Sequence, residues 1–291
     1  MKTVLALFIM TLMAQPTFSR INNAEGIRFN NDEIINGVDG DMNGTGPHMV
    51  FISLVFPDNA SGPTGYYRRN CSASIITPHI LLTAAHCFGL DKSEILKIES
   101  AEIYFTLDIN KIKPIPFITR KFKTHENFNE TKVIYKSDIG YLDNDIALIY
   151  FADKLPKGYV PVDYQKDDDS FLLGQTFRAA GYGMQYDHND ARTNLSSSIG
   201  KLMSTKLKFD DSFPDQQIFK THISASQTTT AICQGDSGGA ALVKNPDGKF
   251  KLVGINSSSG SSELCMTGKS NFTRVALFKD WISSTIAELS R

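Results

Sequence analysis

Residues 80–87 of this chain read Ile-Leu-Leu-Thr-Ala-Ala-His-Cys, an apolar run that ends in a histidine and a cysteine. A short run of this kind is typical of a buried β-strand. Such a strand would place the imidazole of His86 beside Cys87, a candidate half-cystine that would fix the backbone there. Similar β-rich runs recur between turn-forming Gly, Pro, Asn and Asp residues, at 50–56, 75–76, 146–151 and 250–255. The pattern predicts an all-β sandwich or barrel rather than alternating strands and helices.

Near the C-terminus the spacing of apolar residues changes. Apolar residues recur there at helical spacing, namely Val275, Phe278, Trp281, Ile282, Ile286 and Leu289. This spacing predicts one amphipathic helix that packs on the β-structure.

Composition excludes several classes of protein. The 291 residues include 30 Lys and Arg against 31 Asp and Glu, a formal charge of −1, so the basic excess of a nucleic-acid-binding protein is absent. With 41% hydrophobic residues the chain can bury a core, which excludes a disordered protein. The length allows one large core or two of ordinary size.

The N-terminus predicts export. One lysine precedes the apolar run Val4–Met13, which is too short for a membrane span of about 20 residues and is broken by Pro16. We expect residues 1–19 to be a signal peptide, cleaved after Ala14 or Ser19, and residues 20–33 to be a leader. The mature protein would then be secreted to an extracellular or periplasmic space, without stable membrane insertion and with disulfides.

Ser237 is the candidate nucleophile. It lies in Gly-Asp-Ser-Gly-Gly at 235–239, where small residues allow a sharp turn and leave backbone N–H groups for a developing oxyanion. A serine also needs a base, which His86 can supply, and a carboxylate to orient that base. Asp145 is the best carboxylate because it begins a strongly apolar run, where an unpaired charge would be costly.

Chain order separates two serine-hydrolase classes. The Gly-x-Ser-x-Gly pattern also fits an α/β-hydrolase, but that class needs a histidine after the serine, and the last histidine here is His222. The order His86, Asp145, Ser237 instead fits the chymotrypsin arrangement. On these residues the chain resembles the trypsin/chymotrypsin-like serine proteases; further motifs that carry the resemblance lie at 34–37, 83–87, 144–148, 181–183 and 233–239.

The resemblance implies two packed six-stranded antiparallel β-barrels with a C-terminal α-helix, the barrels formed by residues 34–160 and 161–291. It implies a serine endopeptidase that forms an acyl-enzyme on Ser237, with an oxyanion hole from the N–H groups of Gly235 and Ser237. Protein or peptide substrates, no metal or other cofactor, and a monomer are expected. The rival is a catalytically silent binding protein on the same scaffold; such proteins usually lack a triad residue, and none is missing here.

The resemblance also implies two disulfides. Cys71 would pair with Cys87 beside the catalytic histidine, and Cys233 with Cys265 beside the specificity pocket. A zinc site is disfavoured because the four cysteines contain no Cys-x-x-Cys pair. Residues 39–44 resemble the start of a calcium loop but lack the glutamate that completes one.

Activation would follow the family in part. The resemblance implies a zymogen in which cleavage frees the ammonium of Ile34 to pair with Asp236, whose buried charge, left unpaired, would cost about 3–5 kcal/mol. The residue before Ile34 is Glu33, not Lys or Arg. We therefore expect an activating protease that cuts after an acidic residue, or staged trimming from Arg20 or Arg28.

The specificity pocket lacks the acid of trypsin. Six residues before Ser237, where trypsins have Asp, the chain has Ala231. The wall positions correspond to Ser259 and Ser270, and Ser257 lies in the strand that binds the substrate backbone. This predicts non-tryptic specificity, for small or medium apolar side chains or for polar or acidic ones.

Overall fold

The computed structural model describes residues 34, 37–57, 65–89, 95, 97–112, 114–128, 133–135, 140–185, 199–210, 217–221, 231–259 and 270–291. The expected signal peptide, the leader and Cys265 lie outside these residues. Among the described helices, none combines the length and the apolar character needed to cross a bilayer.

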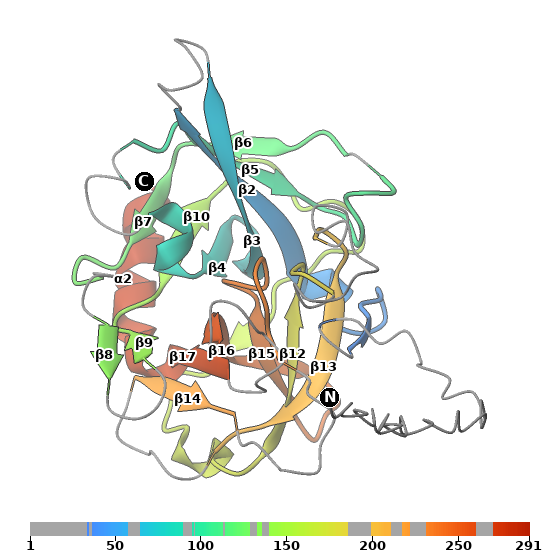
Figure 1. Cartoon of the computed structure of the whole chain (residues 1–291), viewed down its shortest axis with the longest axis vertical. Helices are drawn as coiled ribbons and strands as arrows, with labels where there is room; N and C mark the ends of the chain where they lie inside the picture. Colours follow the sequence, from blue (N-terminus) through green and yellow to red (C-terminus); the bar gives the residue numbers. More distant parts are fainter. Residues whose placement is uncertain are drawn as a thin grey trace, which may run out of the picture. The chain divides into compact units, whose positions relative to one another are not determined.

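The first sheet contains seven strands in the order β6-β5-β2-β3-β4-β10-β7, and all its pairings are antiparallel. Their bounds are β2 Met49–Pro57, β3 Tyr66–Thr77, β4 Ile80–Thr83, β5 Ser100–Tyr104, β6 Phe117–Thr119, β7 Phe122–Thr124 and β10 Ala147–Tyr150. The predicted strand at 80–82 is therefore β4, and all four of its residues are buried. Figure 1 shows these strands in blue to green.

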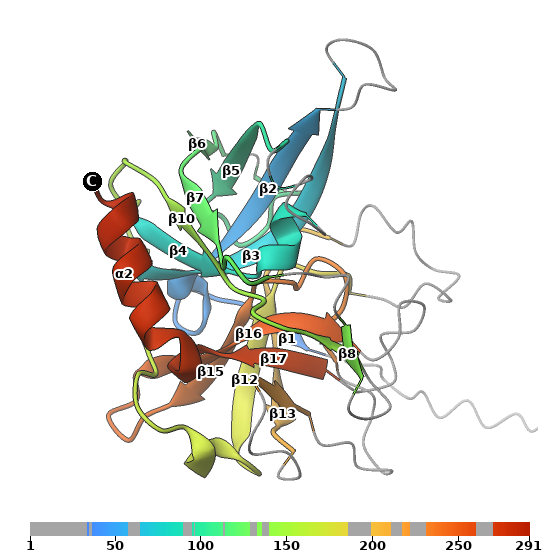
Figure 2. The same cartoon turned by 90° about the vertical axis from the view of Figure 1, so that its left-hand side faces the viewer.

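The second sheet contains eight strands in the order β1-β13-β12-β15-β16-β17-β14, with β11 pairing β16 in parallel. Their bounds are β1 Val38–Asp39, β11 Asp163–Tyr164, β12 Thr176–Gly181, β13 Met203–Lys208, β14 Ile218–Lys220, β15 Ala240–Lys244, β16 Phe250–Ser259 and β17 Ser270–Arg274. A separate pair joins β8 Val133–Tyr135 to β9 Gly140–Leu142. In Figure 2 the second sheet lies below the first.

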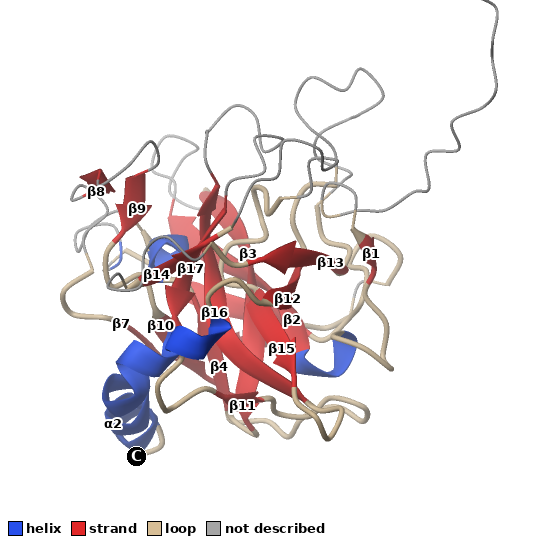
Figure 3. Cartoon of the chain, turned by 90° about the horizontal axis from the view of Figure 1, so that it is seen from below, coloured by secondary structure: helices blue, strands red, loops and turns tan. Residues whose placement is uncertain are grey.

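The C-terminal helix α2 spans Lys279–Leu289 and packs through its buried Ile282 and Leu289. The apolar spacing that begins at Val275 belongs first to a 3₁₀ turn, Val275–Phe278, because a short apolar pattern fits both helix types. Figure 3 shows α2 outside the strands.

The fold prediction is confirmed: two curled sheets, antiparallel except for the β11–β16 pairing, precede one C-terminal helix. The described strands number seven and eight rather than six in each sheet. In the second sheet, β1 and β11 are two-residue additions to the expected set. Such short pairings have no signature in a sequence pattern.

In the described part of the chain, two large clusters of buried hydrophobic residues support the sheets. One is centred on the first sheet and includes Tyr182, which directly follows β12. Its ring packs edge-on against Phe51 of β2, with centroids 5.8 Å apart. The other core lies in the second sheet, where Phe177 stacks on Phe209 at 3.8 Å. The first core therefore joins the two sheets, and the candidate site lies where they meet.

Candidate active site

Strand pairing brings the candidate residues together. Strands β4 and β10 are antiparallel, with Thr83 opposite Ala147. His86 lies in the 3₁₀ helix Ala85–Phe88 just beyond the end of β4, and Asp145 lies just before the start of β10, so both reach the same edge of the first sheet. Ser237 comes from the second sheet, in the turn before β15.

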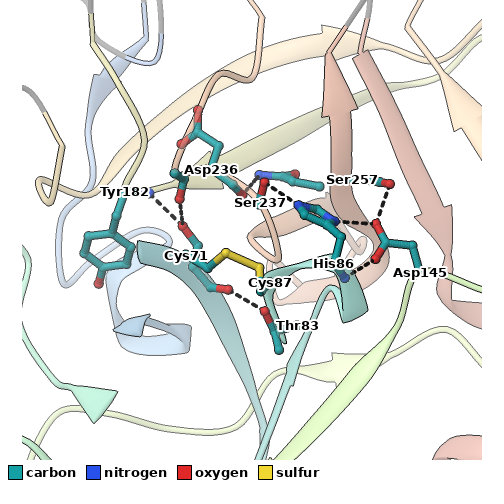
Figure 4. The surroundings of a disulfide bond; sticks show 12 residues. Cys71, Thr83, His86, Cys87, Asp145, Tyr182, Asp236, Ser237 and Ser257 are labelled. Carbon is teal, nitrogen blue, oxygen red and sulfur yellow. Dashed lines mark hydrogen bonds and ion pairs between the residues drawn. A yellow bond between two sulfur atoms is a disulfide. The ribbon is translucent and has the colours of Figure 1, made fainter. Parts of the chain in front are cut away.

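The three side chains form a continuous hydrogen-bonded chain. His86 Nε2 lies 2.8 Å from Ser237 Oγ, and His86 Nδ1 lies 2.8 Å from Asp145 Oδ2. The backbone N–H of His86 also donates to Asp145 Oδ1 at 2.9 Å. Figure 4 shows the imidazole between the serine and the carboxylate. With Nδ1 protonated against the carboxylate, Nε2 is left to accept the serine proton.

The environment keeps Asp145 ionised. Its burial is complete and alone would raise its pKa, but the adjacent imidazole and hydrogen bonds from His86 and Ser257 lower that pKa below its usual value. Ser257 Oγ donates to Asp145 Oδ2 at 2.6 Å. The side chain of His86 is 18% exposed, so substrate and solvent can reach it.

The turn around Ser237 requires glycines. Gly235 has φ +92° and Gly238 has φ +77°, both in the left-handed region. A Cβ on Gly238 would also lie 1.9 Å from Thr83 Oγ1. Within the described part of the chain, the backbone N–H groups of Gly235 and Ser237 donate to no other residue. Both N–H groups are therefore available to bind an oxyanion.

Comparison with known proteins shows which family this chain belongs to. A family model described as Trypsin matches residues 34–282. The chain belongs to the trypsin family. The resemblance inferred from its motifs is confirmed.

Individual relatives agree with this assignment. Chymotrypsin-C of Rattus norvegicus is 27% identical over 236 residues, which cover 76% of this chain and 79% of that protein. Transmembrane protease serine 9 of Rattus norvegicus is 26% identical over 223 residues, which cover 74% of this chain but only 19% of that protein. The solved structure of HL collagenase superposes with a TM-score of 0.63 at 20% identity, covering 87% of this chain and 98% of that one. The two chains therefore share a fold.

Asp236 is the other buried acid of this trypsin-family site. Burial raises its pKa to about 7, although the N–H groups of Cys233 and Gly183 donate to its carboxylate at 2.9 and 2.8 Å. Among the described residues no cation lies against it. Ile34 is buried, but it is an internal residue of this chain and carries no ammonium.

One expected disulfide is present. Cys71 of β3 is bonded to Cys87, with Cα atoms 6.4 Å apart, and Cys87 directly follows His86. The bond thus ties the histidine segment to the first sheet. Cys233 is also disulfide-bonded, and its expected partner Cys265 lies outside the described residues.

The pocket residues are placed in part. Ala231 and Ser270 are buried, and the N–H of Ile232 donates to Ser270 Oγ at 3.3 Å, so the two positions lie on adjoining segments. Ser257 and Ser259 lie on β16, the first buried and the second half-buried. Residues 260–269, which follow β16, lie outside the described residues. In the described part of the chain no group of three His, Cys, Asp or Glu side chains could hold a metal ion.

Two serines have contacts that the motifs do not predict. Ser257, expected only to border the substrate, also donates to Asp145. Ser72, which no motif singles out, contacts the turn that carries Ser237. Their partners are distant in sequence, so only the tertiary structure could identify them.

Proposed function

We propose that this trypsin-family chain is a serine endopeptidase that hydrolyses peptide bonds through an acyl-enzyme at Ser237. The observation that carries the proposal is the imidazole of His86, held at 2.8 Å from both Ser237 Oγ and Asp145 Oδ2. This is the arrangement that acyl transfer by serine needs.

The chemistry then follows in two halves. Ser237 Oγ attacks the peptide carbonyl carbon while His86 Nε2 takes the hydroxyl proton, and the carbonyl oxygen becomes an oxyanion facing the N–H groups of Gly235 and Ser237. When the carbon–nitrogen bond breaks, His86 gives the proton to the leaving amine. Water then attacks the ester, losing a proton to His86, and as the ester bond breaks His86 returns that proton to Ser237 Oγ, which releases the acid and restores the free serine. Asp145 stays ionised and stabilises the imidazolium.

We also infer export and activation by cleavage. The signal-like residues 1–19 and the disulfide beside His86 support an oxidising compartment. The buried Asp236, with a pKa of about 7, supports a zymogen that awaits a cation. Cleavage after Glu33 would supply it from Ile34. The change of sheet between β10 and β11 supports a boundary of the two barrels near residue 160.

The proposed specificity is non-tryptic. Ala231 is fully buried at the position of the trypsin acid, and the neighbouring Ser270 is neutral. A pocket without a carboxylate gives no strong preference for Arg or Lys. A peptide library tests this: we expect cleavage after uncharged or acidic residues, and strong cleavage after Arg would contradict it.

A fluorophosphonate probe tests the proposed activity. We expect covalent labelling at Ser237 in protein processed to begin at Ile34, and no labelling of the Ser237→Ala variant. The matched control is Ser283→Ala, an exposed serine of α2. A correctly processed and folded protein that stays unlabelled would instead be the silent binding protein.

A further inference from the structure

Every polar group of Ser72 is hydrogen-bonded either to the turn that carries Ser237 or to a residue that packs against that turn. It is fully buried on β3, next to the disulfide. Its hydroxyl donates to the carbonyl of Gly235 at 2.9 Å and accepts the N–H of Tyr182 at 2.9 Å. Its own N–H donates to the carbonyl of Ser237 at 2.8 Å, and its carbonyl accepts from Thr83 Oγ1 at 2.8 Å.

Three successive backbone N–H groups, those of residues 182–184, point toward residues 234–236, and the hydroxyl of Ser72 links one of them to this turn. Met184 N–H donates to the carbonyl of Gln234 at 2.8 Å, and Gly183 N–H donates to Asp236 Oδ1 at 2.8 Å. The third donor is the N–H of Tyr182. It is connected to Gly235 through Ser72 Oγ, which accepts from Tyr182 and donates to the carbonyl of Gly235. Three successive N–H groups thus hold residues 234–236, and one of the three connections is a side-chain hydroxyl.

This matters because Gly235 has no side chain to hold it. Two peptide groups meet at its Cα. The Gln234–Gly235 peptide carries the N–H expected in the oxyanion hole, and Met184 anchors its carbonyl on the opposite side. The Gly235–Asp236 peptide has two anchors: its N–H donates to the carbonyl of Cys233 at 3.0 Å, and its carbonyl accepts from Ser72 Oγ at 2.9 Å. Without Ser72 this peptide keeps only the bond at its N–H, and because glycine has few steric limits on φ and ψ, the Gly235 N–H can then turn away from the oxyanion.

We propose that Ser72 is a positioning residue for the oxyanion hole, an inference that rests on the proposed acyl transfer at Ser237. Its hydroxyl connects Tyr182 to Gly235 and so aims the Gly235 N–H. The oxyanion exists in the tetrahedral intermediate and not in bound substrate. Loss of the hydroxyl should therefore lower kcat while leaving KM nearly unchanged.

The test compares Ser72→Ala with Ser74→Ala, both processed to begin at Ile34. Ser74 is a matched control because it is also buried on β3, but among the described residues its hydroxyl contacts only the sulfur of Met49, at 3.7 Å. We expect kcat for a peptide p-nitroanilide to fall about tenfold to a hundredfold in Ser72→Ala, with KM within about twofold. Ser74→Ala should stay within about twofold of wild type on both constants.

A transition-state analogue separates positioning from a merely structural role. A peptide boronate forms a tetrahedral adduct on serine, with one oxygen in the oxyanion hole. We expect its inhibition constant to rise by the same factor by which kcat/KM falls. The pH midpoint of kcat/KM should not move, because His86 and Asp145 are untouched. General loosening of the site would instead raise KM and shift that midpoint.

Three results would overturn the proposal: an unchanged kcat, a rise in KM as large as the fall in kcat, or an unchanged boronate affinity. If Ser72→Ala does not fold, Ser72→Cys replaces the hydroxyl by a slightly larger thiol, which hydrogen-bonds more weakly, and the same measurements on it decide. Failure of the proposed function is a separate result, since wild-type protein would then neither react with the fluorophosphonate nor cleave the substrate.

Discussion

The carboxylate of Asp145 accepts three hydrogen bonds: two from His86 and one from Ser257. Complete burial opposes the charge, and these neighbours reverse that effect, so the pKa lies below its usual value. One side chain therefore fixes the orientation of the imidazole and keeps a negative charge beside it. Its protonation state depends on contacts rather than on its place in a motif.

Asp145→Asn should preserve the fold and lower kcat about 10⁴-fold. The amide would present an N–H₂ group to His86, and the imidazole would then adopt the tautomer that cannot accept the proton of Ser237. Steady-state kinetics at pH 8 would measure this. The control is Asp163→Asn, an exposed acid paired with surface lysines, which should stay within about twofold of wild type. A similar fall in the control would show that Asn substitution acts through the overall charge.

At the scale of elements, the candidate active site is built from residues at the ends of strands. His86 and Asp145 lie at the same edge because β4 and β10 run antiparallel, and Ser237 reaches them from the turn before β15. The histidine segment is a 3₁₀ helix of four residues, too short to hold itself. The disulfide from Cys87 to β3 supplies the tether.

Replacing Cys71 and Cys87 together by alanine should lower the free energy of unfolding by about 3 kcal/mol, given the 16 residues that separate them. The cause is the greater freedom of the unfolded chain without the cross-link. Equilibrium unfolding in urea measures the change. A loss below about 1 kcal/mol would mean that the first core already holds this segment.

At the scale of the whole molecule, the stability of the uncleaved chain should depend on pH through Asp236. Its folded pKa of about 7 exceeds the value near 4 of an exposed Asp. The folded state therefore holds a proton that the unfolded state releases. The free energy of unfolding should fall as pH rises from about 4 to 7, by an amount on the order of 4 kcal/mol, and this contribution then stays constant.

Urea unfolding at several pH values would test this. In Asp236→Asn the slope, meaning the fall in the free energy of unfolding between about pH 4 and 7, should disappear. Protein cleaved before Ile34 should lose the slope as well, because a paired ammonium lowers the pKa of Asp236. Persistence of the slope after cleavage would contradict the proposed activation. Asp145 contributes in the opposite direction, and only below about pH 4, because its folded pKa is lowered.

Local patterns predicted much of this fold. The apolar run at 80–82 is β4, and apolar spacing marked the C-terminal helix, although it could not separate the 3₁₀ turn at Val275–Phe278 from α2. Two-residue strands such as β1 were beyond prediction, because pairing over so few residues depends on the partner strand. The order of His86, Asp145 and Ser237 in the sequence also predicted these three residues as a group, and in the structure they are hydrogen-bonded to one another.

By itself, the sequence determined the trypsin family, the β-rich fold and the three candidate catalytic residues, because strand periodicity and short motifs are properties of neighbouring residues. Only the tertiary structure decided what holds them. Ser72 and Tyr182 are 110 residues apart, and Ser257 and Asp145 are 112 apart. A hydroxyl becomes part of an active site through the partners that folding brings within about 3 Å, and no local pattern records those partners.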